Sequence, residues 1–162
     1  MLDAEKVREL FFYNSKTGVL KWKKAGRGRR PNRIAGALDG KGYCFVHLRP
    51  YGFYRTHRII WLWKTGKWPP GEIDHKNGIR SDNRWCNLRS ATRLQNCHNT
   101  RRTKSKTGIK GVFWHDECKG YAAVIHAEGR KIWLGAHKTP ELAAAAYRKA
   151  AKKYFGEFAR AS

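Results

Sequence analysis

The chain has 162 residues, with 35 Lys and Arg against 12 Asp and Glu, a formal net charge of +23. Because 41% of the residues are hydrophobic and 13% aromatic, the composition excludes a disordered polycation. No apolar run approaches the roughly 20 residues that cross a bilayer, and the first residues do not resemble a signal peptide. Four scattered cysteines without a C-x-x-C pair indicate reduced thiols, so we expect a cytoplasmic protein without a zinc site.

The first hundred residues predict short strands, two small helices and a helix start near position 93. Apolar spacing, turn residues and a helix-stopping glycine define these elements. In chain order, they are a helix over 2–13, a strand over 19–22, a hairpin of 43–48 and 52–56, a helix over 57–65 ended by Gly66, strands over 72–75 and 87–91, and a helix beginning at Arg93.

The last third predicts three strands followed by one helix. The strands are expected over 110–115, 120–126 and 130–135, separated by turns at 118–120 and 128–129. Thr139 as cap, Pro140 at the first position and Glu141 in the first turn mark a helix start. This helix is rich in alanine, so its backbone can lie close to a sheet, and Gly156 is expected to end it.

The positive charge is concentrated in two runs without acids. Residues 21–33 hold seven basic groups and residues 93–106 hold five. Nucleic acid and anionic membrane are the two usual partners of such an excess, and no basic amphipathic helix supports the membrane. Residues 1–106 carry 25 basic and 7 acidic groups, against 10 and 5 in residues 107–162. This asymmetry predicts two modules, joined near the basic stretch 99–107.

Asp74 and His75, at the end of a predicted strand, are the strongest candidates for chemistry. Hydrolysis of a phosphodiester needs a base for water and a positive charge on the phosphate. His75 has an imidazole suited to the first task, whereas Asp74 and Asn96 offer oxygen ligands for a hard divalent ion. The turn Asn77-Gly78 allows Asp74 and His75 to share a site although neighbouring strand residues point to opposite faces.

Two further residues complete this interpretation. His98 competes with Asn96 as the ligand from the helix, but two residues correspond to about 200° of rotation, so only one of them can face the site. We prefer Asn96, which shares a face with Asn99 and Thr100. Asn87 is interpreted as a clamp whose amide bonds the backbone across the loop and holds His75 in place.

Over residues 10–100 the chain resembles phage-type HNH endonucleases, including homing nicking enzymes. The resemblance rests on IDHKNGIRSDNRWCNLRSATRLQNCHN, HRIIWLWKTGKWP, YNSKTGVLKWK and GKGYCFVHL. It implies an α+β architecture with a ββα-metal domain over residues 1–100, including a basic N-terminal region. It also implies His75 as general base, Asp74 and Asn96 as ligands of Mg²⁺ or Mn²⁺, and Asn87 as the middle motif residue. The zinc-binding cysteines of many relatives are absent from this chain.

Residues 107–162 resemble the apetala/ethylene-response-factor type of DNA-binding domain. The resemblance rests on KGVFW, GYAAVI, IWLGAHKTPELAAAAY and FGEFA. It implies a three-stranded antiparallel sheet plus helix, joined to the first domain by a basic linker over 101–106, with the sheet in the major groove. For Trp133 and Trp114, packing against the helix is an equal alternative to DNA contact. The implied contact positions are Lys110, Phe113, His115, Val124, His126, Lys131 and Trp133.

Together these features predict a monomer that nicks double-stranded DNA, in the host cytoplasm if a phage encodes it. We expect further phosphate contacts from basic side chains of the first domain: Arg27, Arg29, Arg30, Arg58, Arg84, Arg89 and Arg93. One alternative is a non-catalytic DNA-binding regulator with a decayed nuclease site, and another is a basic RNA-binding protein. The target sequence and the biological role, whether homing, host DNA degradation or packaging, stay open.

Overall fold

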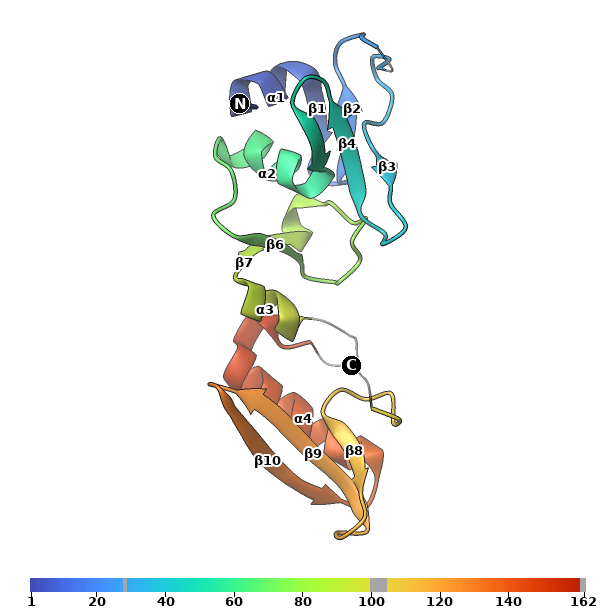
Figure 1. The fold of residues 1–162 in the computed structure, drawn as a ribbon, viewed down its shortest axis with the longest axis vertical. Helices are drawn as coiled ribbons and strands as arrows, with labels where there is room; N and C mark the ends of the chain where they lie inside the picture. Colours follow the sequence, from blue (N-terminus) through green and yellow to red (C-terminus); the bar gives the residue numbers. More distant parts are fainter. Residues whose placement is uncertain (28, 100–104, 161–162) are drawn as a thin grey trace. The chain divides into compact units, whose positions relative to one another are not determined.

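The computed structural model describes residues 1–27, 29–99 and 105–160, which form two compact units (Figure 1). The first unit is Met1–Arg93 and the second is Leu94–Ser162. The predicted basic linker over 101–106 falls mostly outside the described residues, and the predicted domain bounds stay a prediction. Each unit is a mixture of small antiparallel sheets and short helices.

The first unit begins with helix α1 (Ala4–Leu10), whose first turn is capped by the side chain of Asp3. The expected helix over 2–13 is too long, because strand β1 (Phe11–Asn14) follows directly. Residues 11–14 alternate between buried and exposed, the period of a half-buried strand, and β1 pairs antiparallel with β2 (Val19–Trp22). The local helical spacing is therefore overridden by strand pairing.

A second sheet and a helix follow the basic loop. Strands β3 (Ala37–Leu38), β4 (Cys44–Leu48) and β5 (Gly52–Arg55) form an antiparallel sheet in that order. Helix α2 (Thr56–Thr65) comes directly after β5 and ends at Gly66, which has a φ of 76°. The predicted hairpin and helix are both confirmed. The core of the unit is built mainly from α1, β1, β2, β4 and α2, and its fully buried side chains include Val7, Phe11, Leu20, Val46, Leu48, Ile59 and Ile60.

The unit closes with a two-stranded antiparallel sheet of β6 (Glu72–His75) and β7 (Leu88–Ala91). The connection contains the 3₁₀ turn η1 (Trp85–Asn87), so Asn87 precedes the strand in which it was expected. Helix α3 (Arg93–His98) begins where predicted, although all but its first residue belong to the second unit. The chain order strand, loop, strand, helix is the predicted one.

The second unit is a three-stranded antiparallel sheet with a helix on one face (Figure 1). The strands β8 (Val112–His115), β9 (Gly120–Ala127) and β10 (Arg130–His137) lie in the order β10-β9-β8. Helix α4 (Pro140–Phe155) is capped by Thr139 and runs into the 3₁₀ turn η2 (Gly156–Phe158). Its small side chains, among them Ala143 and Ala150, pack on the sheet, as the sequence predicted.

The start of β8 and the length of the helices are two further features of the fold. The first strand of this sheet starts two residues later than expected, because Gly111 has a φ of 72° and lies against Tyr147 and the Val124 carbonyl, where a side chain would not fit. Within the described residues, no helix has both the length and the apolar character needed to span a membrane.

Candidate active site

Asp74 and His75 are the last two residues of β6, and both side chains are almost completely buried. Strand pairing with β7 sets Asp74 opposite Arg89 and His75 opposite Leu88. Because adjacent strand residues point to opposite faces, the two side chains have different neighbours. The predicted carboxylate and imidazole therefore lie next to each other at one strand end, each with its own hydrogen-bond partner.

The His75 imidazole is held by the side chain of Asn83. Its Nε2 lies 3.1 Å from Asn83 Oδ1, and a carboxamide oxygen only accepts hydrogen bonds. Nε2 is therefore the donor, which leaves the lone pair of the neutral ring on Nδ1. Burial lowers the pKa of His75, partly offset by the bond to Asn83, so the ring is neutral at neutral pH. A neutral imidazole held in one tautomer is what a general base requires.

A second histidine, His57 of α2, packs edge-on against His75. The two rings are 5.1 Å apart with an interplanar angle of 90°, and Tyr43 contacts both of them. Burial, reinforced by the neighbouring His75 and arginines, lowers the pKa of His57 to about 3. Its buried Nδ1 has no hydrogen-bond partner among the described residues. Sequence reasoning placed His57 at a helix start and missed this contact, because periodicity does not reveal which helix residue faces a distant strand.

The carboxylate of Asp74 forms an ion pair with Arg89. Arg89 donates from Nε at 2.8 Å and from Nη2 at 2.7 Å, both to Oδ2. The side chains are only 4% and 10% exposed, so this is a buried pair. Arg89 was expected to contact phosphate. In the structure its guanidinium orients Asp74, and the phosphate contact stays a prediction.

Asn87 ties together the loop between β6 and β7. Its Oδ1 accepts from the Asn77 amide N at 2.9 Å, and its Nδ2 donates to the Asp82 carbonyl at 2.7 Å. Asn77 in turn donates to the Asp82 carboxylate at 2.6 Å. These bonds connect both sides of the loop, as a clamp must, whereas a catalytic role for Asn87 stays a prediction.

The loop is also anchored to the N-terminal hairpin. The Tyr13 hydroxyl donates to the Asn83 carbonyl at 2.8 Å, and burial raises the pKa of Tyr13 to about 12. The Trp85 amide donates to the Ser15 carbonyl at 3.2 Å. At Gly18 an added Cβ would lie 2.6 Å from the Arg84 amide N, so this close approach requires glycine. These contacts, which join positions about 70 residues apart, had no signal in the sequence.

Asn96 and His98, the two candidate ligands on α3, lie in the second unit. Asn96 is half-buried, and its place in a metal site with Asp74 stays a prediction. The His98 ring stacks on Phe155, with centroids 3.7 Å apart, and its carbonyl accepts from Lys110 Nζ at 2.8 Å. His98 is thus engaged in the packing of the second unit itself.

The other arginines predicted to contact phosphate have varied surroundings. Arg84 pairs with Asp82, Arg58 donates to the Gly71 carbonyl at 3.2 Å, and Arg93 is exposed at the start of α3. Arg29 and Arg30 line an open cavity of about 530 Å³, with Arg33, Trp22, Gly26 and Ile34, and Arg27 lies exposed in the same loop. Arg29 lies over the Trp22 ring at 5.2 Å.

In the second unit, the predicted contact residues Phe113, His115 and Trp133 share the sheet face that α4 does not cover. The Trp133 ring contacts His115 at 5.4 Å, and Phe113 lies 6.3 Å from the same ring. The residues flanking Trp133 in β10 pack toward α4, so packing of Trp133 itself against the helix is excluded. Trp133 is 47% exposed.

The remaining contact positions differ in exposure. His126 and Lys131 are exposed and pair across β9 and β10, whereas Val124 is buried. Lys110 is half-buried, and burial lowers its pKa. Trp114, also exposed, contacts the Tyr121 ring and donates to Asp116 at 3.0 Å. The exposed positions of this face are thus mainly His126, Lys131 and Trp133.

Comparison with known proteins identifies one segment. No curated protein and no solved structure matches the chain. Residues 54–98 match the family described as HNH endonuclease. That segment contains α2, β6, the clamped loop, β7 and α3, and hence Asp74, His75, Asn87 and Asn96. The buried imidazole and carboxylate at the end of β6 thus lie in an HNH endonuclease domain, which makes the protein a nuclease, a phosphodiester hydrolase acting on DNA.

Proposed function

We propose that the protein is a metal-dependent endonuclease that nicks one strand of duplex DNA per monomer, with His75 as its general base. The observation that carries this proposal is the buried, neutral His75 imidazole, held through Nε2 by Asn83 within the segment matched to HNH endonucleases. The lone pair on Nδ1 takes the proton from the attacking water. Asn87 and Tyr13 act indirectly, because they fix the loop that carries Asn83.

The side-chain oxygens of Asp74 and Asn96 are suitable ligands for a hard divalent ion such as Mg²⁺ or Mn²⁺. Arg89 orients the Asp74 carboxylate, a role that neighbouring groups commonly have toward metal ligands. In the described ranges, no three His, Cys, Asp or Glu side chains lie together as a metal-binding group. The proposed site differs from such a group, because it has only one carboxylate, from Asp74, and one carboxamide, from Asn96. When bound, the ion supplies positive charge to the phosphate and the leaving oxygen.

The stacking of His98 on Phe155 supports Asn96 as the ligand from α3. The two choices are separable by substitution. We expect Asn96→Ala to raise strongly the Mg²⁺ concentration that supports half-maximal nicking. We expect His98→Ala to leave this concentration nearly unchanged. The opposite ranking would assign His98 instead.

We further propose that the second unit docks the duplex through the sheet face carrying His126, Lys131 and Trp133, in the manner of apetala-type domains. The exposure of these three side chains and the chain's net charge of +23 support this. A phage-type, homing-like enzyme working as a monomer in the host cytoplasm is the corresponding biological proposal. The family match does not favour the alternative of a non-catalytic regulator.

Relaxation of supercoiled plasmid tests the proposed activity. With Mg²⁺ or Mn²⁺ we expect open circles, the product of one nick, and a rate lowered by about 10²- to 10⁴-fold in His75→Ala. A thermal melt of the variant controls for folding, and a chelator controls for contaminating metal. The proposal fails if neither ion supports nicking, or if the nicking that occurs is unaffected by His75→Ala.

A further inference from the structure

Strand β4 presents a row of aromatic side chains on the face turned away from the core. Val46 and Leu48 are buried, so the alternate residues Phe45 and His47 point outward. His47 stacks on Phe53 of β5, with ring centroids 4.1 Å apart and planes 6° from parallel. Phe45 lies 6.0 Å from Phe53, which is 70% exposed. Three aromatic rings thus form one exposed platform, which neither the catalytic proposal nor the core uses.

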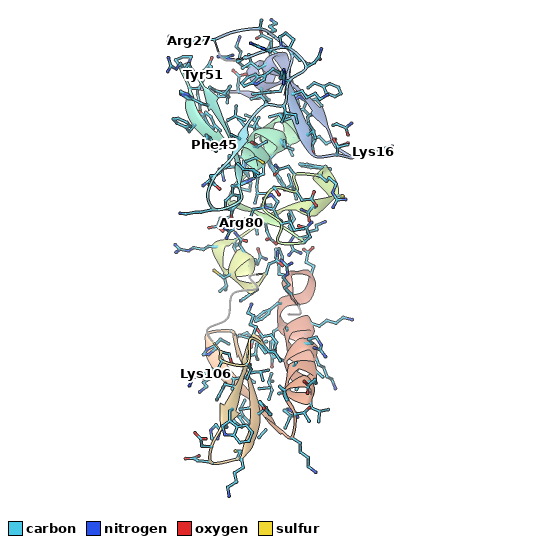
Figure 2. The ribbon with its side chains drawn as sticks, turned by 90° about the vertical axis from the view of Figure 1, so that its right-hand side faces the viewer. Lys16, Arg27, Phe45, Tyr51, Arg80 and Lys106 are labelled. Atoms are coloured by element: carbon cyan, nitrogen blue, oxygen red, sulfur yellow. The ribbon has the colours of Figure 1, made fainter. Side chains whose placement is uncertain are left out.

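Both ends of this platform are cationic. At the start of β4, the guanidinium groups of Arg55 and Arg80 each lie 4.7 Å from the Tyr43 ring centroid, and that ring contacts His75. Arg55 also forms an ion pair with Asp39, so Arg80 is the main cation at this end. At the other end, the Arg49 carbonyl accepts from Arg29 at 3.5 Å. The platform therefore lies between the catalytic histidine and the arginine-lined cavity. In Figure 2, Arg27, Phe45 and Arg80 follow one another down the first unit.

The arginine cavity is electrostatically unbalanced. Among the described residues, none of Arg29, Arg30 and Arg33 forms an ion pair with a carboxylate. These are three of the groups that line the 530 Å³ cavity, and Ile34 beside them is 66% exposed. Unpaired guanidinium groups around a hollow are suited to bind phosphate oxygens, with two parallel bonds each.

We propose that this surface, from Tyr43 along Phe45, His47 and Phe53 to the arginine cavity, binds an unpaired stretch of single-stranded DNA. Bases stack on the aromatic rings, and phosphates contact the arginines. Alternating aromatic faces and cations are the general means of holding single strands. Duplex bases do not suit this surface, because their faces already stack on their neighbours. The distance from Tyr43 to Arg49 is about 20 Å at roughly 3.3 Å per residue, enough for several nucleotides.

The choice of DNA rests on the proposed function, whereas the stacking itself does not. The surface leads to His75, so an unpaired flank would place the neighbouring phosphodiester near the catalytic base. The preferred substrate would then be DNA with an unpaired stretch beside the cut, such as a bubble or a single-stranded tail.

Binding of the full chain to an oligothymidylate, measured by fluorescence anisotropy in chelator, tests the inference. We expect Phe53→Ala to weaken single-strand binding about 5- to 100-fold and to change duplex binding less than about twofold. Phe53→Trp should restore binding, because it keeps a ring for stacking. Phe12→Ala, which removes another exposed phenylalanine of the same unit, is the matched control and should have no effect.

A second variant tests the cavity. Replacing Arg29 and Arg33 by Ala should lower the salt dependence of single-strand binding by about 0.7 per lost phosphate contact. The inference is overturned if Phe53→Ala weakens duplex binding as much as single-strand binding, or changes neither. Tighter binding of oligouridylate than of oligothymidylate would overturn the choice of DNA. Because no metal is present, a protein that shows the Phe53 effect but never nicks plasmid would refute the proposed function alone.

Discussion

The sheet of β6 and β7 and the sheet of β8 to β10 use polar side chains in opposite ways. In the first, Asp74, His75 and Asn87 are buried, and each is hydrogen-bonded to another part of the same unit. In the second, His126 and Trp133 are exposed on the face opposite α4. Chemistry needs groups whose positions are set before the substrate arrives, whereas recognition needs groups whose partners come with the ligand.

This contrast has an energetic side. A buried charge or imidazole depends on every partner, because removal of one partner leaves the other desolvated and unpaired. An exposed side chain loses little when it is replaced. Substitutions of these buried groups should therefore lower the stability of the first unit strongly, whereas substitutions on the exposed sheet face of the second unit should change stability little.

Arg89→Ala should have the largest effect on stability. The variant leaves the buried Asp74 carboxylate without its guanidinium, which should lower the free energy of unfolding by about 3–5 kcal/mol. Arg84→Ala is the matched control, because it removes an ion pair with Asp82 in which Arg84 is 49% exposed and screened by water, so its loss of stability should be much smaller. Urea titrations measure both. Similar losses for the two variants would show that burial does not distinguish these pairs.

His57→Phe should change how stability depends on pH. Unfolded His57 binds a proton below about pH 6.5, but the folded ring does so only near pH 3, so the unfolded state holds more protons between these values. The folded state thus loses stability as the pH falls below 6.5, by about 2 kcal/mol at pH 5 from this residue. In His57→Phe, the loss of stability caused by protonation of His57 should disappear. The loss caused by His75, whose pKa is also lowered, should remain.

Urea titrations of both proteins at pH 7, 6 and 5 measure the effect, and a wild-type slope in His57→Phe would contradict the low pKa of His57.

Trp133→Ala should leave stability nearly unchanged and lower affinity for duplex DNA about five- to tenfold. Trp114→Ala is matched in exposure, 49% against 47%, but Trp114 contacts Tyr121 and Asp116 instead of the outer sheet face. Its affinity should stay within about twofold of the wild type. Anisotropy with one duplex at fixed salt measures both variants. Equal losses would remove Trp133 from the proposed interface.

Local signals in the sequence predicted most elements. Gly66 and Thr139 mark helix ends that the structure confirms, and the turns at 118–120 and 128–129 separate β8, β9 and β10 as predicted. The main error, the helix over 2–13, arose because Phe11 fits a helical face as well as it fits the buried side of β1. Periodicity over so few residues does not separate the two, and pairing with β2 decides.

In the candidate site, the sequence likewise predicted some residues and missed others. Its residues Asp74 and His75 were found because they occur side by side at a predicted strand end, with Asn87 and Asn96 at suitable spacing. Their partners were missed: Asn83 had no assigned bond, His57 was read as a helix residue, and Arg89 was assigned to phosphate. Each of these contacts depends on how separate elements pack, which spacing along the chain does not encode.

Tyr13, Ser15 and Gly18 contact the loop between β6 and β7, and these contacts limit how far the chain can be shortened. A fragment limited to residues 54–98, the segment matched to HNH endonucleases, would lack the β1–β2 hairpin to which Asn83 and Trp85 are hydrogen-bonded. Such a fragment would retain all four motif residues and still lose the support that orients His75. The shortest nuclease fragment suitable for fusion to another DNA-binding domain therefore has to include β1 and β2.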